Sequence, residues 1–186
     1  MKMKFKVFFA SAELSWKNQL YLTVTGRNDW DSKLAFSKQK SFFYPSVGLS
    51  ALLSEMVKLP EVISYAKIRG SYTVVASSFD RFLTNPGYEY NSQTHNWANP
   101  TVYPMDNMKP EKTKSWEIGL NLKFWGNRFN LDATYYRSNT LNQTFKVDIP
   151  SSSGYKQAIV QAGNVQNQGI ELALGFSDKW AGFGWS

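Results

Sequence analysis

The sequence contains no cysteine, so neither a disulfide framework nor a thiolate metal site can form. It also lacks an apolar run of the roughly 20 residues that a membrane-spanning helix needs. One histidine, His95, is present, and without cysteine or a neighbouring carboxylate motif it makes a weak metal or acid–base site. Gly-x-Ser-x-Gly, His-Glu-x-x-His and phosphate-loop motifs are absent. We therefore expect no enzyme activity, no metal ion and no cofactor.

What the sequence does contain is a series of segments of about ten residues in which apolar and polar residues alternate. Between Lys114 and Trp125 the apolar residues fall on one side and Ser, Glu, Gly, Asn and Lys on the other. A period of two is typical of a strand with one buried face. The polar face is rich in Ser, Thr, Asn, Gly and Tyr, which indicates a water-filled lumen more than the Lys- and Glu-rich surface of a globular sandwich.

The connections between these segments alternate in length. We expect strands near residues 3–15, 18–28, 44–56, 63–76, 114–125, 128–140, 155–163 and 167–177, with the beginning of a ninth at 182–186. Short connections are expected at 16–18, 58–62, 126–128 and 178–181, whereas long ones cover 29–43, 77–113 and 141–154. Transmembrane barrels have short turns on the periplasmic side and long loops outside.

Aromatic residues make up 16% of the chain, and many lie at the ends of the alternating segments. Transmembrane barrels place aromatic girdles at such positions, where the ring is half in lipid and half in water. Aromatic residues also favour strands on any sheet, so this feature alone leaves both interpretations open. The residues concerned are Trp16, Trp30, Tyr44, Trp116, Trp125 and Trp180.

The net charge of +7 raises the possibility of nucleic-acid binding. The cations are dispersed, however, and no nucleic-acid-binding motif accompanies them, so we expect no nucleic-acid partner. In an outer membrane protein they can pair with phosphates of the outer leaflet or with acidic groups in a lumen. Outer membrane lipid is therefore an expected partner.

Four blocks carry a closer resemblance. They are Tyr21–Trp30 (YLTVTGRNDW), Ser41–Gly48 (SFFYPSVG), Lys109–Glu117 (KPEKTKSWE) and Asn164–Glu171 (NVQNQGIE). Together they resemble barrel segments of the SusC/RagA family of TonB-dependent outer membrane transporters. The resemblance implies an all-β fold: an antiparallel transmembrane β-barrel segment of about eight strands, from a larger, 22-stranded barrel.

The same resemblance implies a function. Members of that family reside in the outer membrane of Gram-negative bacteria, carry an N-terminal plug, are capped by a SusD-like surface lipoprotein and are energised by TonB. We expect residues 1–186 to be a partial barrel domain of an importer of nutrients, with a glycan-derived oligosaccharide as the leading substrate and a peptide as the alternative. No plug domain and no signal peptide are recognisable, so we expect a fragment truncated at both ends, which alone could be neither energised nor gated.

The long loop and the polar faces supply candidate binding residues. The loop at 77–113 places aromatic rings among Asn, Gln and Thr, a mixture that stacks on sugar rings and binds their hydroxyls. Such rings can equally hold a long loop together. The candidates for substrate contact are Tyr88, Tyr90, His95 and Trp97, and those for lining the lumen are Arg69, Glu117 and Asp132.

Two competing functions remain. A soluble β-rich module for carbohydrate binding or adhesion would show polar residues on any outward sheet face, yet Leu20, Leu22, Leu120 and Leu122 are apolar. A passive pore without TonB coupling would differ only in having no plug. We also expect the isolated chain to be poorly soluble and to associate through its open sheet edges.

Overall fold

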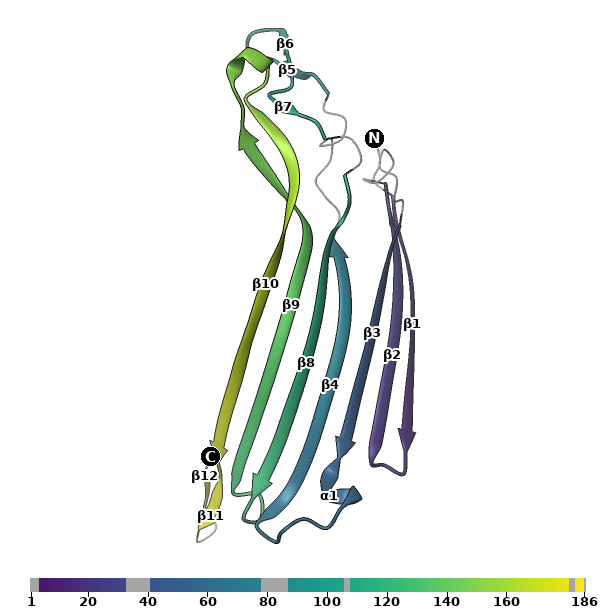
Figure 1. Cartoon of the computed structure of the whole chain (residues 1–186), viewed down its shortest axis with the longest axis vertical. Coiled ribbons are helices and arrows are strands. Elements are labelled where there is room, and N and C mark those ends of the chain that lie inside the picture. Colours follow the sequence, from purple (N-terminus) through teal and green to yellow (C-terminus); the bar gives the residue numbers. More distant parts are fainter. Residues whose placement is uncertain (1–3, 33–40, 78–86, 106–107, 181–182, 186) are drawn as a thin grey trace.

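The computed structural model describes residues 4–32, 41–77, 87–105, 108–180 and 183–185. In these ranges the chain forms one curved sheet of long antiparallel strands (Figure 1) in the order β1-β2-β3-β4-β8-β9-β10-β7. The long strands are β1 (Phe5–Trp16), β2 (Leu20–Asp31), β3 (Ser41–Leu52), β4 (Ile63–Ser77), β8 (Glu111–Phe124), β9 (Phe129–Asp148) and β10 (Gln157–Phe176). The all-β expectation and the sheet of about eight strands are confirmed.

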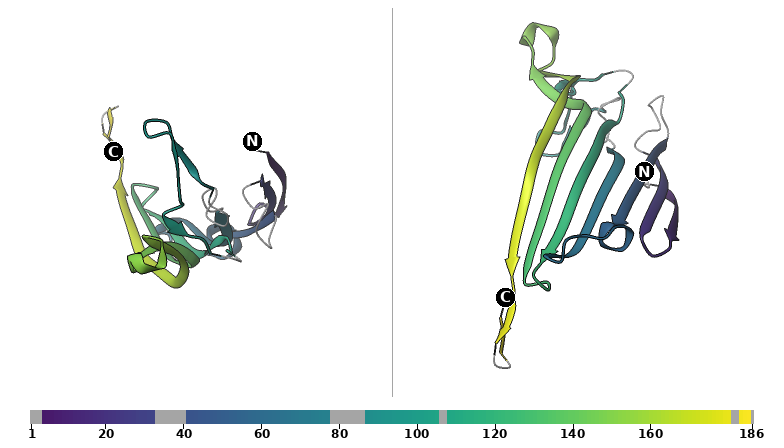
Figure 2. Two further views of the ribbon diagram at one scale, coloured as in Figure 1. Left: turned by 90° about the horizontal axis from the view of Figure 1, so that it is seen from above. Right: turned by 60° about the horizontal axis from the view of Figure 1, so that its bottom comes forward.

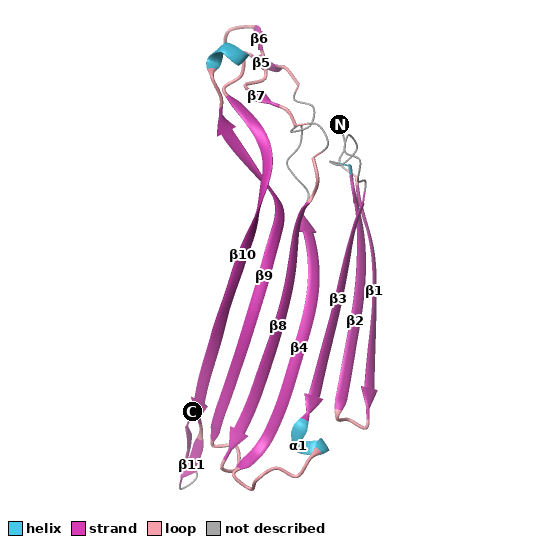
Figure 3. Cartoon of the chain, viewed as in Figure 1, coloured by secondary structure: helices cyan, strands magenta, loops and turns pink. Residues whose placement is uncertain are grey.

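Short secondary-structure elements lie at the two ends of this sheet (Figure 3). A hairpin of β5 (Glu89–Asn91) and β6 (Asn96–Ala98) and the short strand β7 (Val102–Tyr103), parallel to β10, belong to the long connection between β4 and β8. The other short elements are α1 (Leu53–Met56), the 3-10 turn η2 (Ser151–Ser153), β11 (Asp178–Trp180) and β12 (Phe183–Trp185). None of the helices in the described ranges has the length and apolar character to cross a membrane.

Tight turns join β1 to β2 and β8 to β9 at one end of the sheet, where α1 also connects β3 to β4. We call this the turn end; the opposite end is the loop end. Between β1 and β2, Lys17 and Asn18 both have positive φ, of 49° and 53°. Two successive residues with positive φ are the signature of the hairpin turn whose twist matches that of the strands. Asn18 accepts this geometry because its side chain tolerates the left-handed region. The turn between β8 and β9 uses three such residues, Trp125, Gly126 and Asn127.

The strand register separates the two faces of the sheet by polarity. One face carries a continuous row of hydroxyl groups across five strands, formed by Thr25, Ser46, Thr73, Ser115 and Ser138. Viewed from above, the sheet forms an arc, and the segment of β5 to β7 lies inside it (Figure 2). Phe42, on the same face as Thr25, contacts Met108 of that connection. The polar face is therefore the concave face.

The convex face is apolar and largely uncovered. On β10 its residues Ile170, Leu172 and Leu174 are 71%, 69% and 82% exposed. The few buried hydrophobic side chains include a small cluster of Phe42, Met108 and Ile159 at the loop end. A soluble domain buries one face of each sheet against another layer, so this sheet has the burial pattern of a wall between an apolar and an aqueous phase.

Two details of the expected strands are wrong. The segments at 155–163 and 167–177 form a single strand, β10, and residues 141–148 continue β9, so the expected loop at 141–154 is only the short connection around η2. Asn142 and Gly163, opposite each other, have φ of 59° and 91°. They form a bend above which the β9–β10 hairpin twists away from the sheet (Figure 1).

Other expectations at the chain's ends and loops need smaller corrections. The strand expected at 44–56 ends at Leu52 and is followed by α1. Of the ninth strand expected at 182–186, residues 183–185 form β12, which pairs with β11, and the remaining two positions lie outside the described residues. Within the long loop at 77–113, residues 78–86 and 106–107 lie outside the description, as do 33–40 of the loop at 29–43.

Candidate lumenal site

An ion pair spanning three strands lies on the concave face. Arg69 on β4 donates two hydrogen bonds to the carboxylate of Asp132 on β9, both of 3.0 Å. Its Nη2 also donates to Thr134 Oγ1 at 2.8 Å, and Asn121 on β8 donates to Asp132 Oδ2 at 3.0 Å. A bidentate arginine–carboxylate pair with additional donors is geometrically well defined. The network therefore fixes β4, β8 and β9 relative to one another.

Arg69 can reach Asp132 only because β8 carries glycine between them. Arg69 and Thr134 both pair with Gly119, and the arginine side chain lies directly over it. A Cβ atom built on Gly119 would be 2.6 Å from Arg69 Nε and 2.8 Å from its Cζ. Gly119 is thus required for space, without any unusual backbone conformation.

The sequence-based set of Arg69, Glu117 and Asp132 lies on one face, as its alternation predicts. Glu117, which pairs with Ser71 and Tyr136, occupies the row next to Gly119. Only Arg69 and Asp132 of the three are joined by a hydrogen bond in the described structure. Whether this face lines a lumen stays a prediction.

A second polar cluster, towards the loop end, was not predicted. Arg27 donates two hydrogen bonds of 2.7 Å to Asp29, two residues along β2, and the guanidinium lies 5.7 Å from the ring centroid of Tyr44. Asp29 is only 3% exposed. These three residues and Thr73 border a hollow of about 390 Å³ that opens beside the upper part of β3 and β4. The sequence signal that could have revealed this cluster is a pair of opposite charges at positions i and i+2, which lie on the same face of a strand.

This hollow lies where the β3–β4 ladder ends. Pairing runs from Leu52–Lys67 up to Ser46–Thr73 and stops below Pro45. Proline has no N–H to donate to a ladder, which accounts for the end of pairing at this point. Tyr44, expected in an aromatic girdle, instead faces the concave side beside Arg27.

The loop candidates are partly brought together. Tyr90 and Trp97 face each other across the β5–β6 hairpin with ring centroids 5.1 Å apart, and Tyr90 Oη lies 3.2 Å from His95 Nδ1. Tyr90 is 51% and Trp97 67% exposed, so both offer ring surface to solvent. Tyr88 precedes the hairpin and is also exposed. Among the residues that the structure describes, no group of His, Asp and Glu could hold a metal ion.

The segment that follows β7 is held against the sheet by Gln161. The Lys109 N–H donates to Gln161 Oε1 at 2.7 Å, while Gln161 Nε2 donates back to the carbonyl oxygen of Lys109. Met108 next to it is 2% exposed and packs against Phe42 and Ile159. This docking couples the long connection to both β3 and β10 and was not visible in the sequence, because it depends on contacts between distant segments.

Removing the Gln161 side-chain amide should release this segment. In Gln161→Leu we expect the backbone amide of Lys109 to exchange with deuterium roughly tenfold faster or more, because its hydrogen-bond acceptor is lost. Hydrogen exchange followed by mass spectrometry would measure this. Gln157→Leu is the matched control, since Gln157 donates to Asp148 at 2.9 Å within the hairpin; equal protection of Lys109 in all three proteins would contradict the docking role.

Aromatic clusters border the convex apolar surface at the turn end and towards the loop end. At the turn end, Trp125 packs on Phe129 and Phe129 on Phe176, with centroids 5.2 and 4.6 Å apart. Towards the loop end, Trp116 packs on Tyr135 at 5.3 Å. Trp116 and Phe124 are separated by about 26 Å of strand at 3.3 Å per residue. At a barrel strand tilt of about 40° this corresponds to about 20 Å along the barrel axis, somewhat less than the roughly 25 Å of an outward apolar band.

The chain is similar to known TonB-dependent receptors. The family model described as "TonB dependent receptor-like, beta-barrel" matches residues 2–186. The TonB-dependent receptor P26 of Formosa agariphila is 26% identical over 176 residues, and the TonB-dependent receptor SusC of Bacteroides thetaiotaomicron is 25% identical over 182 residues. Each of these matches covers 90% of this chain and 18% of the relative, so the chain spans less than a fifth of their length.

A solved structure shares the fold. The RagAB peptide importer in its open-open state superimposes with a TM-score of 0.79 at 20% identity, over 96% of this chain and 20% of that one. At 20% identity this superposition shows a shared fold and no more. With the match over nearly its whole length, the chain belongs to the TonB dependent receptor-like β-barrel family.

Proposed function

We propose that this chain is part of the barrel wall of a SusC/RagA-type transporter that imports a nutrient across the outer membrane of a Gram-negative bacterium. The single observation that carries this proposal is the separation of the sheet into a polar concave face and an exposed apolar convex face with aromatic clusters at both levels. In this orientation the turn end is periplasmic and the loop end extracellular. Binding and transport need no catalytic group, and the proposal includes none.

We propose an oligosaccharide as the substrate. Tyr90 and Trp97 present exposed ring surface beside His95, and the electron-rich face of an aromatic ring attracts the polarised C–H groups of a sugar. The hydroxyl and amide side chains of the concave face would bind sugar hydroxyls along the path. A peptide is the second candidate: the structural neighbour RagAB is described as a peptide importer, and the Arg27–Asp29 pair could meet peptide charges.

Two partners follow from the family. A SusD-like surface lipoprotein would cap the loop end, where the β5–β6 hairpin and the β9–β10 hairpin project (Figure 1). TonB would act through parts of the full-length transporter other than this sheet. Both partners belong to the proposal and rest on membership of the family.

Removing the two rings tests the substrate site. In the full-length transporter, Tyr90→Ala with Trp97→Ala should reduce oligosaccharide binding by roughly 5- to 150-fold, since stacked aromatic contacts contribute about 0.5–1.5 kcal/mol each. Calorimetric titration with a series of oligosaccharides and a series of peptides of similar size would measure this, alongside uptake by cells.

Thr94→Ala, at the exposed tip of the same hairpin, is the matched control and should bind normally. Heat-dependent gel mobility would confirm that each barrel assembles. If the double variant imports its substrate like the parent, the hairpin is not part of the substrate site. If peptides bind and oligosaccharides do not, the peptide candidate replaces the oligosaccharide.

A further inference from the structure

The charges of the long strands are sorted between the two faces of the sheet. Among the described residues of these strands between the turns and the bend at Asn142 and Gly163, every carboxylate lies on the concave face. These residues are Glu13, Asp29, Asp31, Glu111, Glu117, Asp132 and Glu171. On the convex face of the same strands, the charged residues are all cations: Lys6, Lys112, Lys114 and Arg137.

Three of these cations form a cluster above the aromatic pair Trp116–Tyr135. Arg137 pairs directly with Trp116, and Lys114 and Lys112 follow on the convex side of β8 towards the loop end. Both lysines are exposed. Because residues directly opposite or diagonal on neighbouring strands lie about 5–8 Å apart, a single anionic group can contact Arg137 and Lys114 together.

Neutral amides orient Arg137 in this cluster. Arg137 Nη2 donates to Gln166 Oε1 at 2.6 Å, and Gln166 Nε2 donates to Gln168 Oε1 at 2.9 Å. Asn139 Nδ2 donates to Asn164 Oδ1 at 3.0 Å in the next part of the same face. The guanidinium is thus oriented without a carboxylate partner. The positive charge of the cluster remains available to an external anion, and the surrounding amides suit hydroxyl groups.

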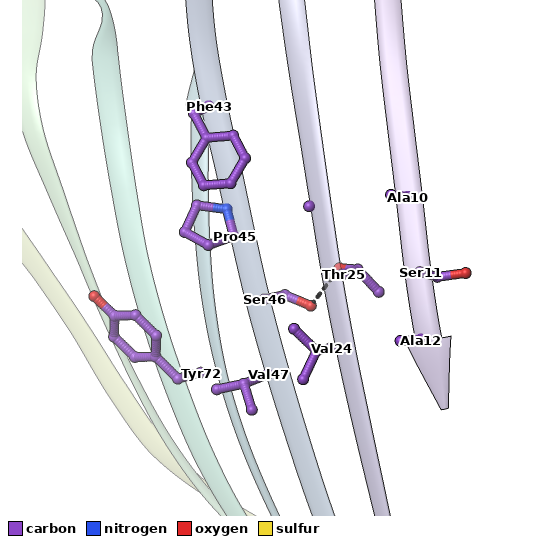
Figure 4. A pocket seen from close by; sticks show the side chains of 11 residues that line it. Ala10, Ser11, Ala12, Val24, Thr25, Phe43, Pro45, Ser46, Val47 and Tyr72 are labelled. Carbon is purple, nitrogen blue, oxygen red and sulfur yellow. Dashed lines mark hydrogen bonds between the residues drawn. The ribbon is translucent and has the colours of Figure 1, made fainter. Parts of the chain in front are cut away.

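An apolar groove lies on the convex face beside this cluster. Its volume is about 410 Å³, and the small residues Ala10, Ala12 and Gly26 line it together with Pro45. Phe43 and Tyr72 border it (Figure 4). Tyr72 pairs with Trp116, which pairs with Arg137, so with strands 4.7–4.9 Å apart the groove's border is roughly 10 Å from the cation cluster.

We infer that this part of the convex face binds a phosphorylated glycolipid of the outer leaflet. Phosphate would lie against Arg137, Lys114 and Lys112, the sugar against the amides, and an acyl chain in the groove. Charge complementarity carries the inference. Towards the turn end the convex face is apolar, and towards the loop end its charged residues are all cations. This order matches a lipid whose acyl chains lie in the membrane interior and whose anionic headgroup lies at the membrane surface. The inference rests on the orientation of the sheet under the proposed function.

Lipid binding by charge variants tests the inference. The full-length transporter, purified in detergent, would be titrated with bisphosphorylated lipid A and the complexes counted by native mass spectrometry. A triple variant combines Lys112→Gln, Lys114→Gln and Arg137→Gln. We expect its affinity for lipid A to be roughly 100-fold lower, because each lost cation weakens binding about fivefold. Lipid A without its phosphates should bind the parent protein as weakly as the intact lipid binds the variant.

Matched variants separate recognition from folding. Lys67→Gln with Lys123→Gln removes two cations from the concave face and should leave lipid A binding unchanged. The single variant Arg137→Lys keeps the positive charge and leaves Lys112 and Lys114 unchanged. It should retain most of the lipid A binding. Ala12→Leu, which fills the groove, should weaken binding of lipid A but not of its deacylated, phosphorylated headgroup.

Several results would overturn the inference: equal lipid A binding by the triple variant, equal binding of phosphate-free lipid A, or complete displacement by millimolar inorganic phosphate, which would indicate a simple anion site. Substrate uptake is measured on the same proteins. If the triple variant loses lipid binding but retains substrate uptake, the inference is supported and the transport proposal stays intact. If the parent protein neither inserts into the membrane nor takes up substrate, the transport proposal is removed.

Discussion

Gly119→Ala should destabilise the barrel, although alanine is the smallest possible side chain to add. The new Cβ would stand 2.6 to 2.9 Å from three atoms of Arg69, so the arginine must leave its position over β8 and abandon both hydrogen bonds to Asp132. Overpacking of this kind costs about 1–3 kcal/mol of the free energy of unfolding. Urea unfolding of the full-length protein in detergent, followed by gel mobility, measures it.

The chain offers a matched control on the same face. Gly48 lies in the middle of β3 between Thr23 and Ser71, and a Cβ there would meet nothing within 4 Å. Gly48→Ala should therefore leave the free energy of unfolding within about 0.5 kcal/mol of the parent value. Equal effects of the two alanines would mean that glycine content, and not the Arg69 side chain, determines the stability.

A double-mutant cycle isolates the cause. Arg69→Ala leaves Asp132 with Asn121 and Thr134 as donors and should be destabilising by itself. Once Arg69 is absent, adding Gly119→Ala should cost almost nothing, because the space above β8 is empty. An additive double variant would contradict the steric explanation, since residues in contact are expected to show a coupling energy.

The sequence predicted what depends on period-two alternation. Alternation predicts that Arg69, Glu117 and Asp132 lie on one face, and they share it, because a strand's side chains alternate regardless of its neighbours. The same alternation could not show that Arg69 reaches Asp132 and not Glu117. That contact depends on the register of three strands and on a glycine in the middle one, neither of which a single strand's pattern contains.

The sequence also failed where the backbone leaves the regular strand. Alternation is interrupted at Asn142 and at Gly163, so the sequence predicts a loop at 141–154 and two strands in place of β10. The two interruptions lie opposite each other, and the paired positive φ values bend a continuous hairpin. Likewise the contact of Met108 with Phe42 joins segments whose proximity only the folded sheet reveals.

The 186-residue chain produced alone should not behave as a soluble protein. In detergent-free buffer we expect it to aggregate or to form large oligomers, visible by light scattering and size-exclusion chromatography. Two of its long strands, β1 and β10, are sheet edges over most of their length, and open edges pair with other chains. The apolar convex face adds to this, with Leu14, Leu172 and Leu174 each more than 60% exposed.

Charge on the convex face should then act in opposite directions in two contexts. Leu172→Lys with Leu174→Lys should increase the soluble fraction of the isolated chain, because charges on an edge strand oppose edge-to-edge pairing. In the full-length transporter the same pair should impair assembly in the membrane, since a lysine on the lipid face at mid-depth costs about 2–4 kcal/mol. Ala173→Lys, on the concave face between them, is the control and should leave assembly intact. A soluble monomer that unfolds cooperatively, or a full-length protein indifferent to both lysines, would mean that the convex face does not contact lipid.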